Sequence, residues 1–195
     1  MSTNKTALLL MDFHRAIVDG HGAAGHAAVS QTGRALDAAR RTGLAVLHVV
    51  PHYRNGYPEL PQGAPFDAVR AAGLFAEPHI AMGIIDALAP QPNEPVIAKS
   101  RYSPFWANDL LSMLHTQAIS HLVLTGIATS GVVLSAVRDA WDRDYRVTVL
   151  SDCCCDPDPA VHATLINKIF PQQATVIDVA VWEARIGDSG KSLPA

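Results

Sequence analysis

Two charged side chains stand where apolar runs of the sequence end. Asp12 closes the run ALLLMD, and Lys99 closes the run VIAK. A third feature is segment 126–136, GIATSGVVLSA, where small residues separate a strand-like run from a helix-like run. A carboxylate and an ammonium can move and stabilise protons, and backbone N–H groups at a helix start can hold a developing negative charge. If they meet, these features predict proton-transfer chemistry on a small molecule.

The elements that would position these residues alternate between strands and helices along the whole chain. Most strand candidates are too apolar for a sheet with one exposed face, so we expect parallel strands covered on both faces. Ligands of such sheets bind beyond the carboxyl ends of the strands, so Asp12 and Lys99 would share one edge. The strand candidates are Thr6–Asp12, Ala45–Val50, Pro95–Lys99, His121–Gly126, Arg146–Ser151 and Thr175–Val179.

Capping residues and apolar periodicity predict the helices between these strands. The exception is His52–Glu94, a long stretch rich in proline and glycine, which is typical of a lid, a binding loop or an oligomer contact. The predicted helices are Gly25–Thr42, Phe105–Thr116 after the Ser103–Pro104 cap, the stripe 133–141, the segment 161–169 after Asp158–Pro159, and a short helix that starts near Val181 and frays after Gly187.

Composition narrows the functional class. A chain of 195 residues that is 49% hydrophobic predicts a single domain over residues 1–195. Its net charge of −3 without a basic cluster argues against nucleic acid and membrane partners. The cysteines are consecutive (Cys153–Cys155), which suits neither distant disulfides nor zinc, and Met1–Lys5 lacks a signal-peptide pattern. We therefore expect a reduced, cytoplasmic protein.

Three segments in this order make the sequence resemble the isochorismatase-like hydrolase superfamily, which includes nicotinamidases and N-carbamoylsarcosine amidohydrolases. They are LLLMDFHRAIVDG, VIAKSRYSPFWANDL and HLVLTGIATSGVVLSAVRDAWDRDYRVTVLSDCC, and the resemblance extends from Thr6 to Val181. It implies a three-layer α/β/α fold whose six-stranded parallel sheet has the Rossmann-like order 3-2-1-4-5-6. It also implies a small-molecule substrate, no cofactor, and a homodimer or homotetramer.

The resemblance assigns catalysis to Asp12 and Lys99, and it places the cysteine of the amidase branch at Val132. In that branch the aspartate takes the thiol proton while nearby backbone N–H groups hold an oxyanion. Valine retains the N–H but has no nucleophile. Isochorismatases also lack the cysteine, and are thought to use the aspartate as an acid that protonates an enol ether so that water adds and pyruvate leaves. Burial would raise the pKa of Asp12 and Lys99 would lower it, and the sequence does not decide the balance.

Nicotinamidases also bind a metal after the second strand. Here HVVPHYRNGYPELP keeps His48 and His52 but has no Asp-x-His pair, so we expect no metal, a structural His48, and a His52 that can touch substrate. His14 is either a second proton carrier or a pocket wall. Phe105 and Trp106 either line the pocket or pack the next helix. The predicted substrate-binding set is Phe13, His14, His52, Tyr102, Trp106, Ala128, Thr129, Gly131 and Val132.

Three functional hypotheses follow. The leading one is a hydrolase in which Asp12 and Lys99 assist water attack on a small carboxylate-bearing substrate, with enol-ether cleavage as its most concrete form. The second is a catalytically silent relative that binds a ligand or serves as an oligomeric scaffold. A flavin- or nucleotide-binding module is disfavoured because DFHRAIVDG contains no G-x-G-x-x-G or phosphate loop. Thr129 and Ser130 are expected to cap a helix, and the cysteines to be buried, rather than to act as nucleophiles.

Overall fold

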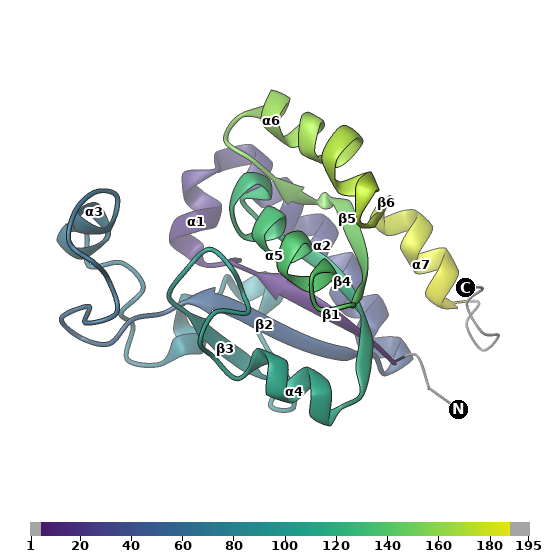
Figure 1. Cartoon of the computed structure of the whole chain (residues 1–195), viewed down its shortest axis with the longest axis horizontal. Helices are drawn as coiled ribbons and strands as arrows, with labels where there is room; N and C mark the ends of the chain where they lie inside the picture. The colour runs from purple at the N-terminus through teal and green to yellow at the C-terminus, as the bar shows by residue number, and fades with distance from the viewer. Residues whose placement is uncertain (1–4, 188–195) are drawn as a thin grey trace.

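A six-stranded parallel sheet forms the centre of the molecule. The computed structural model describes residues 5–187, and its strand order β3-β2-β1-β4-β5-β6 confirms the predicted topology (Figure 1). The strands are β1 (Lys5–Met11), β2 (Ala45–Pro51), β3 (Val96–Lys99), β4 (Ile119–Ile127), β5 (Arg146–Cys155) and β6 (Thr175–Ile177).

Helices cover both faces of this sheet, which explains why its strands are continuously apolar. In β1, Leu9 and Met11 pack toward the face covered by α4 (Leu110–Thr116) and α5 (Leu134–Trp141). The alternate residues Leu8 and Leu10 pack toward α2 (Gly22–Thr42) and α7 (Val179–Gly187). Both sets are almost fully buried. The predicted three-layer α/β/α architecture is confirmed.

Most predicted helices are present, with shifted starts. Helix α2 ends at Gly43, whose φ of 69° is the left-handed C-cap expected of glycine. A separate short helix, α1 (Arg15–Gly20), precedes it and was not predicted. Asp158 caps α6 (Pro159–Thr164) as predicted, by accepting a hydrogen bond of 2.8 Å from the N–H of Ala160. The chain continues through a π-helical turn (Leu165–Ile169) and a short 3₁₀ turn (Phe170–Gln172).

The predicted helix Phe105–Thr116 is wrong before Leu110. Ser103 does accept a hydrogen bond of 3.1 Å from the N–H of Phe105, but no helix follows there. Ala107 has a φ of 48°, which breaks a right-handed helix, and the side-chain amide of Asn108 donates to the Ala98 and Pro104 carbonyls. The helix therefore starts only at Leu110.

The last predicted strand also ends earlier than expected. Val179 was assigned to the strand but opens α7, and its N–H donates to Oδ1 of Asp152 at 2.9 Å. Asp178 accepts from the N–H of Val181 at 2.8 Å and so ends the extended segment. The predicted fraying after Gly187 lies outside the described residues.

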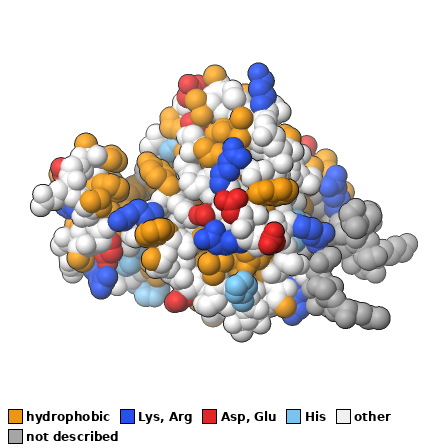
Figure 2. Space-filling model, in the orientation of Figure 1, with side chains coloured by type: hydrophobic (Ala, Val, Ile, Leu, Met, Phe, Trp, Pro, Cys, Tyr) orange, Lys and Arg blue, Asp and Glu red, His pale blue; other side chains and the backbone are white. Residues whose placement is uncertain are grey.

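The segment between β2 and β3 leaves the body of the molecule and then returns. It contains α3 (Phe66–Ala71), none of whose residues is buried, and Figures 1 and 2 show this part as a lobe standing out from the body. Two 3₁₀ turns follow on the return path, η1 (Ile80–Gly83) and η2 (Asp86–Leu88). Within residues 5–187 no helix has the length and apolar character required to cross a membrane.

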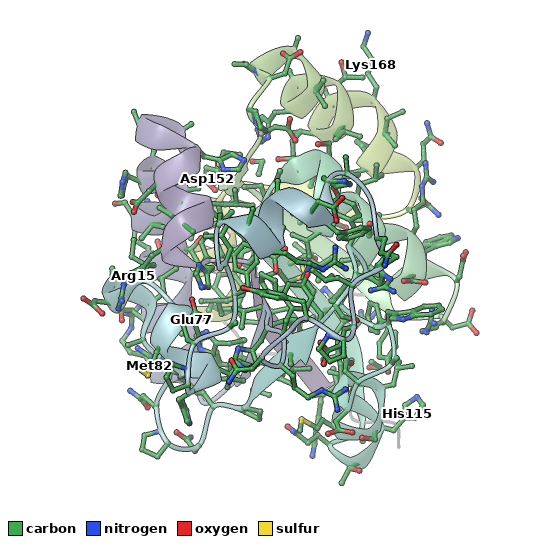
Figure 3. All side chains as sticks on the ribbon, turned by 90° about the vertical axis from the view of Figure 1, so that its left-hand side faces the viewer. Arg15, Glu77, Met82, His115, Asp152 and Lys168 are labelled. Carbon is green, nitrogen blue, oxygen red and sulfur yellow. The ribbon has the colours of Figure 1, made fainter. Side chains whose placement is uncertain are left out.

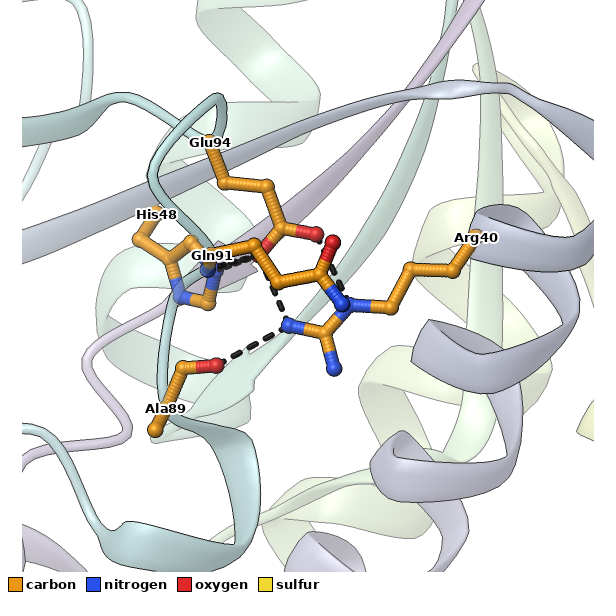
Figure 4. A network of polar contacts seen from close by, with 5 residues as sticks. All are labelled: Arg40, His48, Ala89, Gln91 and Glu94. Atoms are coloured by element: carbon orange, nitrogen blue, oxygen red, sulfur yellow. Dashed lines mark hydrogen bonds and ion pairs between the residues drawn. The ribbon is translucent and has the colours of Figure 1, made fainter.

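An ion-pair network fixes the point where this segment re-enters the sheet (Figure 4). Arg40 donates from two nitrogens to the Glu94 carboxylate at 2.8 Å each, and the N–H of Gln91 donates to it at 2.8 Å. Burial raises the pKa of Glu94, but Arg40, Gln91 and His48 outweigh it and lower the pKa to about 2. His48 in β2 lies 3.4 Å from Glu94, and burial lowers its pKa. His48 is therefore a buried structural residue.

Candidate active site

Asp12 and Lys99 meet at the carboxyl edge of the sheet. Asp12 directly follows β1 and Lys99 ends β3, so the two side chains reach across the end of β2. Oδ2 of Asp12 lies 2.9 Å from Nζ of Lys99, and the side chains are 8% and 5% exposed. Lys99 also donates to the carbonyl of Arg101 at 2.9 Å. The expectation that these charges lie together is met, and their catalytic role remains a prediction.

The environment of Asp12 raises the pKa of its carboxyl toward neutrality. Burial raises the pKa of its carboxyl, while the charge and hydrogen bond of Lys99 lower it, and the outcome is a pKa of about 6 instead of 3.8. Oδ1 is buried and has no hydrogen-bond partner among the described residues. One carboxylate oxygen is thus held by Lys99, while the other has no hydrogen-bond partner among the described residues.

The turn after β4 brings Val132 next to the end of β1. Gly126 pairs with Met11, and a Cβ added at Gly126 would lie 2.8 Å from the Met11 carbonyl oxygen and 3.3 Å from Cγ1 of Val132. The Ile127–Ala128 peptide bond is cis, and a π-helical turn (Thr129–Val133) leads into α5. Val132 is 1% exposed and belongs to the core beneath this turn. Val132 itself offers its backbone N–H but no nucleophilic side chain.

Neighbouring side chains hold this turn in place. The hydroxyl of Thr129 lies 2.8 Å from Nδ1 of His162, and Oδ2 of Asp156 accepts from the N–H of Ser130 at 2.7 Å. Neither Thr129 nor Ser130 caps the helix with its side chain as predicted, because the N-cap position falls on Ala128. His162, which lies one helix further along the chain, was not among the predicted site residues.

The predicted lining residues occupy different environments. Tyr102 lies over the turn, with its ring 3.4 Å from where a Cβ on Gly131 would be, and its side chain remains largely exposed. Trp106 is also exposed. Phe13 instead lies in the core on the α2 face, with 1% of its surface exposed. Phe105 packs into the opposite core, where its ring stacks on Tyr145.

The three cysteines at the end of β5 are unsuited to nucleophilic attack. All are free and buried. Burial raises the pKa of Cys154 to about 12 and that of Cys155 to about 11, and it raises the pKa of Cys153 further still. Thiols in this state are rarely ionised near neutral pH, so they behave as small apolar side chains.

His14 and His52 both point to Glu77, which was not among the predicted site residues. Nε2 of His14 lies 2.8 Å from Oε1 of Glu77, and Nδ1 of His52 lies 4.0 Å from Oε2. Glu77 belongs to the long segment between β2 and β3, whose path has no periodic pattern from which it could be predicted. In the part of the chain that the structure describes, no three side chains of His, Cys, Asp or Glu are arranged to hold a metal ion.

Comparison with known proteins agrees with this fold. The isochorismatase domain matches residues 6–181. Ureidoacrylate amidohydrolase RutB of Stutzerimonas stutzeri is 31% identical over 191 residues, covering 86% of this chain and 77% of that protein. RutB of Methylorubrum extorquens is 33% identical over 182 residues, covering 86% and 73% respectively.

Solved structures show the same architecture. An isochorismatase family protein from Burkholderia thailandensis has a TM-score of 0.80 at 26% identity, covering 95% of this chain and 97% of its own. N-carbamoylsarcosine amidase from Thermoplasma acidophilum shares the fold with a TM-score of 0.72 at 24% identity, covering 90% and 96%. The chain therefore belongs to the isochorismatase family of hydrolases.

Proposed function

We propose that the protein hydrolyses a small carboxylate-bearing substrate by attack of water, assisted by Asp12 and Lys99 and without a cysteine nucleophile. The observation that carries the proposal is the state of Asp12. One of its oxygens is 2.9 Å from Lys99, the other is buried without a partner among the described residues, and its pKa is raised to about 6. Such a carboxyl can donate or accept a proton at physiological pH.

Enol-ether cleavage is the most concrete form of this reaction. Protonated Asp12 gives its proton to the methylene carbon, and the neighbouring ether oxygen stabilises the cation that forms. Water adds to the cationic carbon and loses a proton to Asp12, and the resulting hemiketal collapses to pyruvate and an alcohol. Lys99 keeps Asp12 oriented, and its charge limits how far burial can raise the pKa of the carboxyl. None of these reaction steps requires a thiol.

Amide hydrolysis is the competing reaction for the same site. The curated relatives are named for ureidoacrylate, a carboxylate that carries a ureido group. In that reaction ionised Asp12 would act as the base that takes a proton from the attacking water. The buried Val132 favours the enol-ether form, because direct water attack on an amide is the harder reaction when no covalent intermediate is available.

Turnover assays on isochorismate and ureidoacrylate test this proposal. Asp12→Ala and Lys99→Ala should each abolish turnover, while Asp86→Asn, which changes an exposed carboxylate, should retain it. Full activity in either alanine variant would end the proposal. Absence of turnover in the wild type, together with stabilisation by either compound, would favour the silent ligand-binding alternative.

We also propose a homodimer or homotetramer. The exposed aromatic side chains of Tyr102 and Trp106 and the projecting α3 region support it, because large apolar side chains at a surface are typical of contact sites. Light scattering during size-exclusion chromatography measures the mass directly. A monomer at micromolar concentration would contradict the proposal.

A further inference from the structure

His14 fixes the returning part of the long segment onto the end of β1. Its Nδ1 accepts a hydrogen bond of 3.2 Å from the N–H of Ala16 and so caps α1. Because Nδ1 is an acceptor, the ring proton belongs on Nε2, which donates to Oε1 of Glu77 at 2.8 Å. These two hydrogen bonds assign the tautomer of His14 and orient the Glu77 carboxylate.

Packing around the His14 ring makes this orientation rigid. The ring contacts Phe75 edge to face, with centroids 4.7 Å apart. Gly83 approaches so closely that an added Cβ would lie 2.2 Å from Nε2 of His14. His14 also forms an antiparallel bridge with Ile84. The segment that carries Glu77 is therefore held at the sheet edge, and Figure 3 labels Glu77 in the same region of the view as Arg15 and Met82.

The second oxygen of Glu77 faces His52 across a short gap. Oε2 of Glu77 and Nδ1 of His52 are 4.0 Å apart, and both atoms are buried without a hydrogen-bond partner among the described residues. The backbone of His52 is tied to the sheet, because its N–H donates to the Lys99 carbonyl at 3.3 Å. A separation of 4.0 Å is too long for a direct hydrogen bond, so each atom keeps a hydrogen-bonding position that the described residues do not fill.

We propose that Glu77 and His52 form a substrate subsite that binds an NH₂ or O–H group next to the Asp12–Lys99 pair. Oε2 of Glu77 accepts one hydrogen from that group, and Nδ1 of His52 either accepts the second hydrogen of an NH₂ group or donates to the oxygen of an O–H group. His14 is the positioning residue for Glu77. The proposal rests on the proposed hydrolase function and narrows its substrate class. The substrate is a small carboxylate that carries an amide, ureido or hydroxyl group, and donor-free carboxylates of the same shape are disfavoured.

The chemistry of Glu77 gives this subsite its selectivity. A buried carboxylate oxygen that is left unpaired destabilises the complex, so a ligand that donates a hydrogen bond to it is preferred over one that cannot. A ligand carbonyl facing Oε2 is also repelled. Since His14 already holds Oε1, the carboxylate cannot rotate to avoid the ligand without breaking that hydrogen bond.

Two isosteric probes test the subsite on the full-length protein. Ureidoacetate and 4-oxopentanoate share a carboxylate, a carbonyl and a shape, and they differ in that N–H groups of the first are replaced by CH₂ and CH₃ in the second. Isothermal titration calorimetry should show that the wild type binds ureidoacetate about tenfold more tightly, as expected for one satisfied buried acceptor. Equal affinities, or no binding of ureidoacetate, would overturn the proposal without requiring any variant.

Glu77→Gln provides the matched test of the residue. The N–H of His14 should hold the new amide oxygen, which turns the amide NH₂ toward the ligand. The preference for ureidoacetate should then disappear while binding of 4-oxopentanoate is unchanged or improved. Asp86→Asn, on the same segment and exposed, should keep the wild-type preference. A preference retained in Glu77→Gln would overturn the assignment.

The outcome separates this inference from the proposed function. A lost preference in Glu77→Gln, with no turnover of any substrate by the wild type, would retain the subsite and reject the hydrolytic proposal. Turnover that depends on Asp12, with an unchanged preference in Glu77→Gln, would retain the hydrolytic proposal and reject the subsite.

Discussion

Lys99 reaches across the end of β2 and places its ammonium nitrogen 2.9 Å from Oδ2 of Asp12. The two residues follow strands that are not adjacent, and both side chains are almost fully buried. This contact moderates a carboxyl whose pKa burial would otherwise raise further. It also leaves Oδ1 free of protein partners among the described residues.

Removal of Lys99 should therefore raise the pKa of Asp12 above its present value of about 6. In Lys99→Met both effects that lower the pKa are lost, and burial remains. We expect Asp12 to stay protonated at pH 7 in this variant. Carbon-13 NMR titration of aspartate-labelled protein measures the shift, with Asp12→Asn identifying the signal. An Asp12 pKa at or below that of the wild type would contradict the role given to Lys99.

Asp12 should also make the stability of the fold depend on pH. Its folded-state pKa of about 6 is raised above 3.8, so the folded protein holds this proton more tightly than the unfolded chain. The stabilisation from Asp12 is fully present below about pH 4 and is lost as the pH rises to 6. Two pKa units correspond to about 3 kcal/mol.

Urea unfolding of the wild type and Asp12→Asn at several pH values measures this effect. The stability of the variant relative to the wild type should rise by roughly 2–3 kcal/mol between pH 4 and pH 7. A difference that stays constant over this range would show that Asp12 has an ordinary pKa.

Loss of the Arg40–Glu94 pair should destabilise the protein. Glu94 is buried and receives two hydrogen bonds from Arg40, so Glu94→Ala leaves a partly buried guanidinium without its carboxylate. We expect a loss of about 3 kcal/mol in the free energy of unfolding, measured by urea titration. Glu183→Ala, which removes an exposed pair with Arg34, should cost less than about 1 kcal/mol. Similar losses in both variants would contradict the structural importance of this network.

A cysteine at position 132 tests whether the turn retains the geometry for thiol chemistry. In Val132→Cys the thiol would lie beside the end of β1, near the Asp12–Lys99 pair, and a nearby ammonium lowers a thiol pKa. We expect rapid labelling by iodoacetamide at pH 7 and new amidase activity. Val133→Cys, at the adjacent and similarly buried position, is the control for burial alone and should remain unreactive. An inert thiol at position 132 would argue that the site has drifted from amidase geometry.

The sequence predicted the sheet well because its strands are continuously apolar and follow one another in regular β-α-β order. Asp12 and Lys99 could be placed at one edge because parallel strands point the same way. Helix starts were less predictable: the cap at Ser103 is real, but the left-handed backbone at Ala107 has no signal in the sequence. Phe13 was expected in the pocket, and burial in the core fits its apolar ring equally well.

Residues that depend on the long segment could not be predicted. Glu77 lies 63 positions from His14, and no periodicity indicates that the chain returns to cover the end of β1. Whether burial or Lys99 has the larger effect on the pKa of Asp12 also depends on packing. The sequence would be the same if Asp12 and Lys99 were exposed to solvent at the sheet edge. The position of Glu77 and the burial of Asp12 both depend on the three-dimensional path of the chain.

The pH dependence of kcat/KM for isochorismate, in the wild type and in Asp12→Glu, tests the mechanism most directly. If Asp12 acts as an acid, kcat/KM is highest below its pKa of about 6 and falls as the pH rises through that value. The midpoint should move in Asp12→Glu, because the carboxyl changes its distance from Lys99. An activity that instead increases through pH 6, or a midpoint unaffected by the substitution, would contradict the acid role of Asp12.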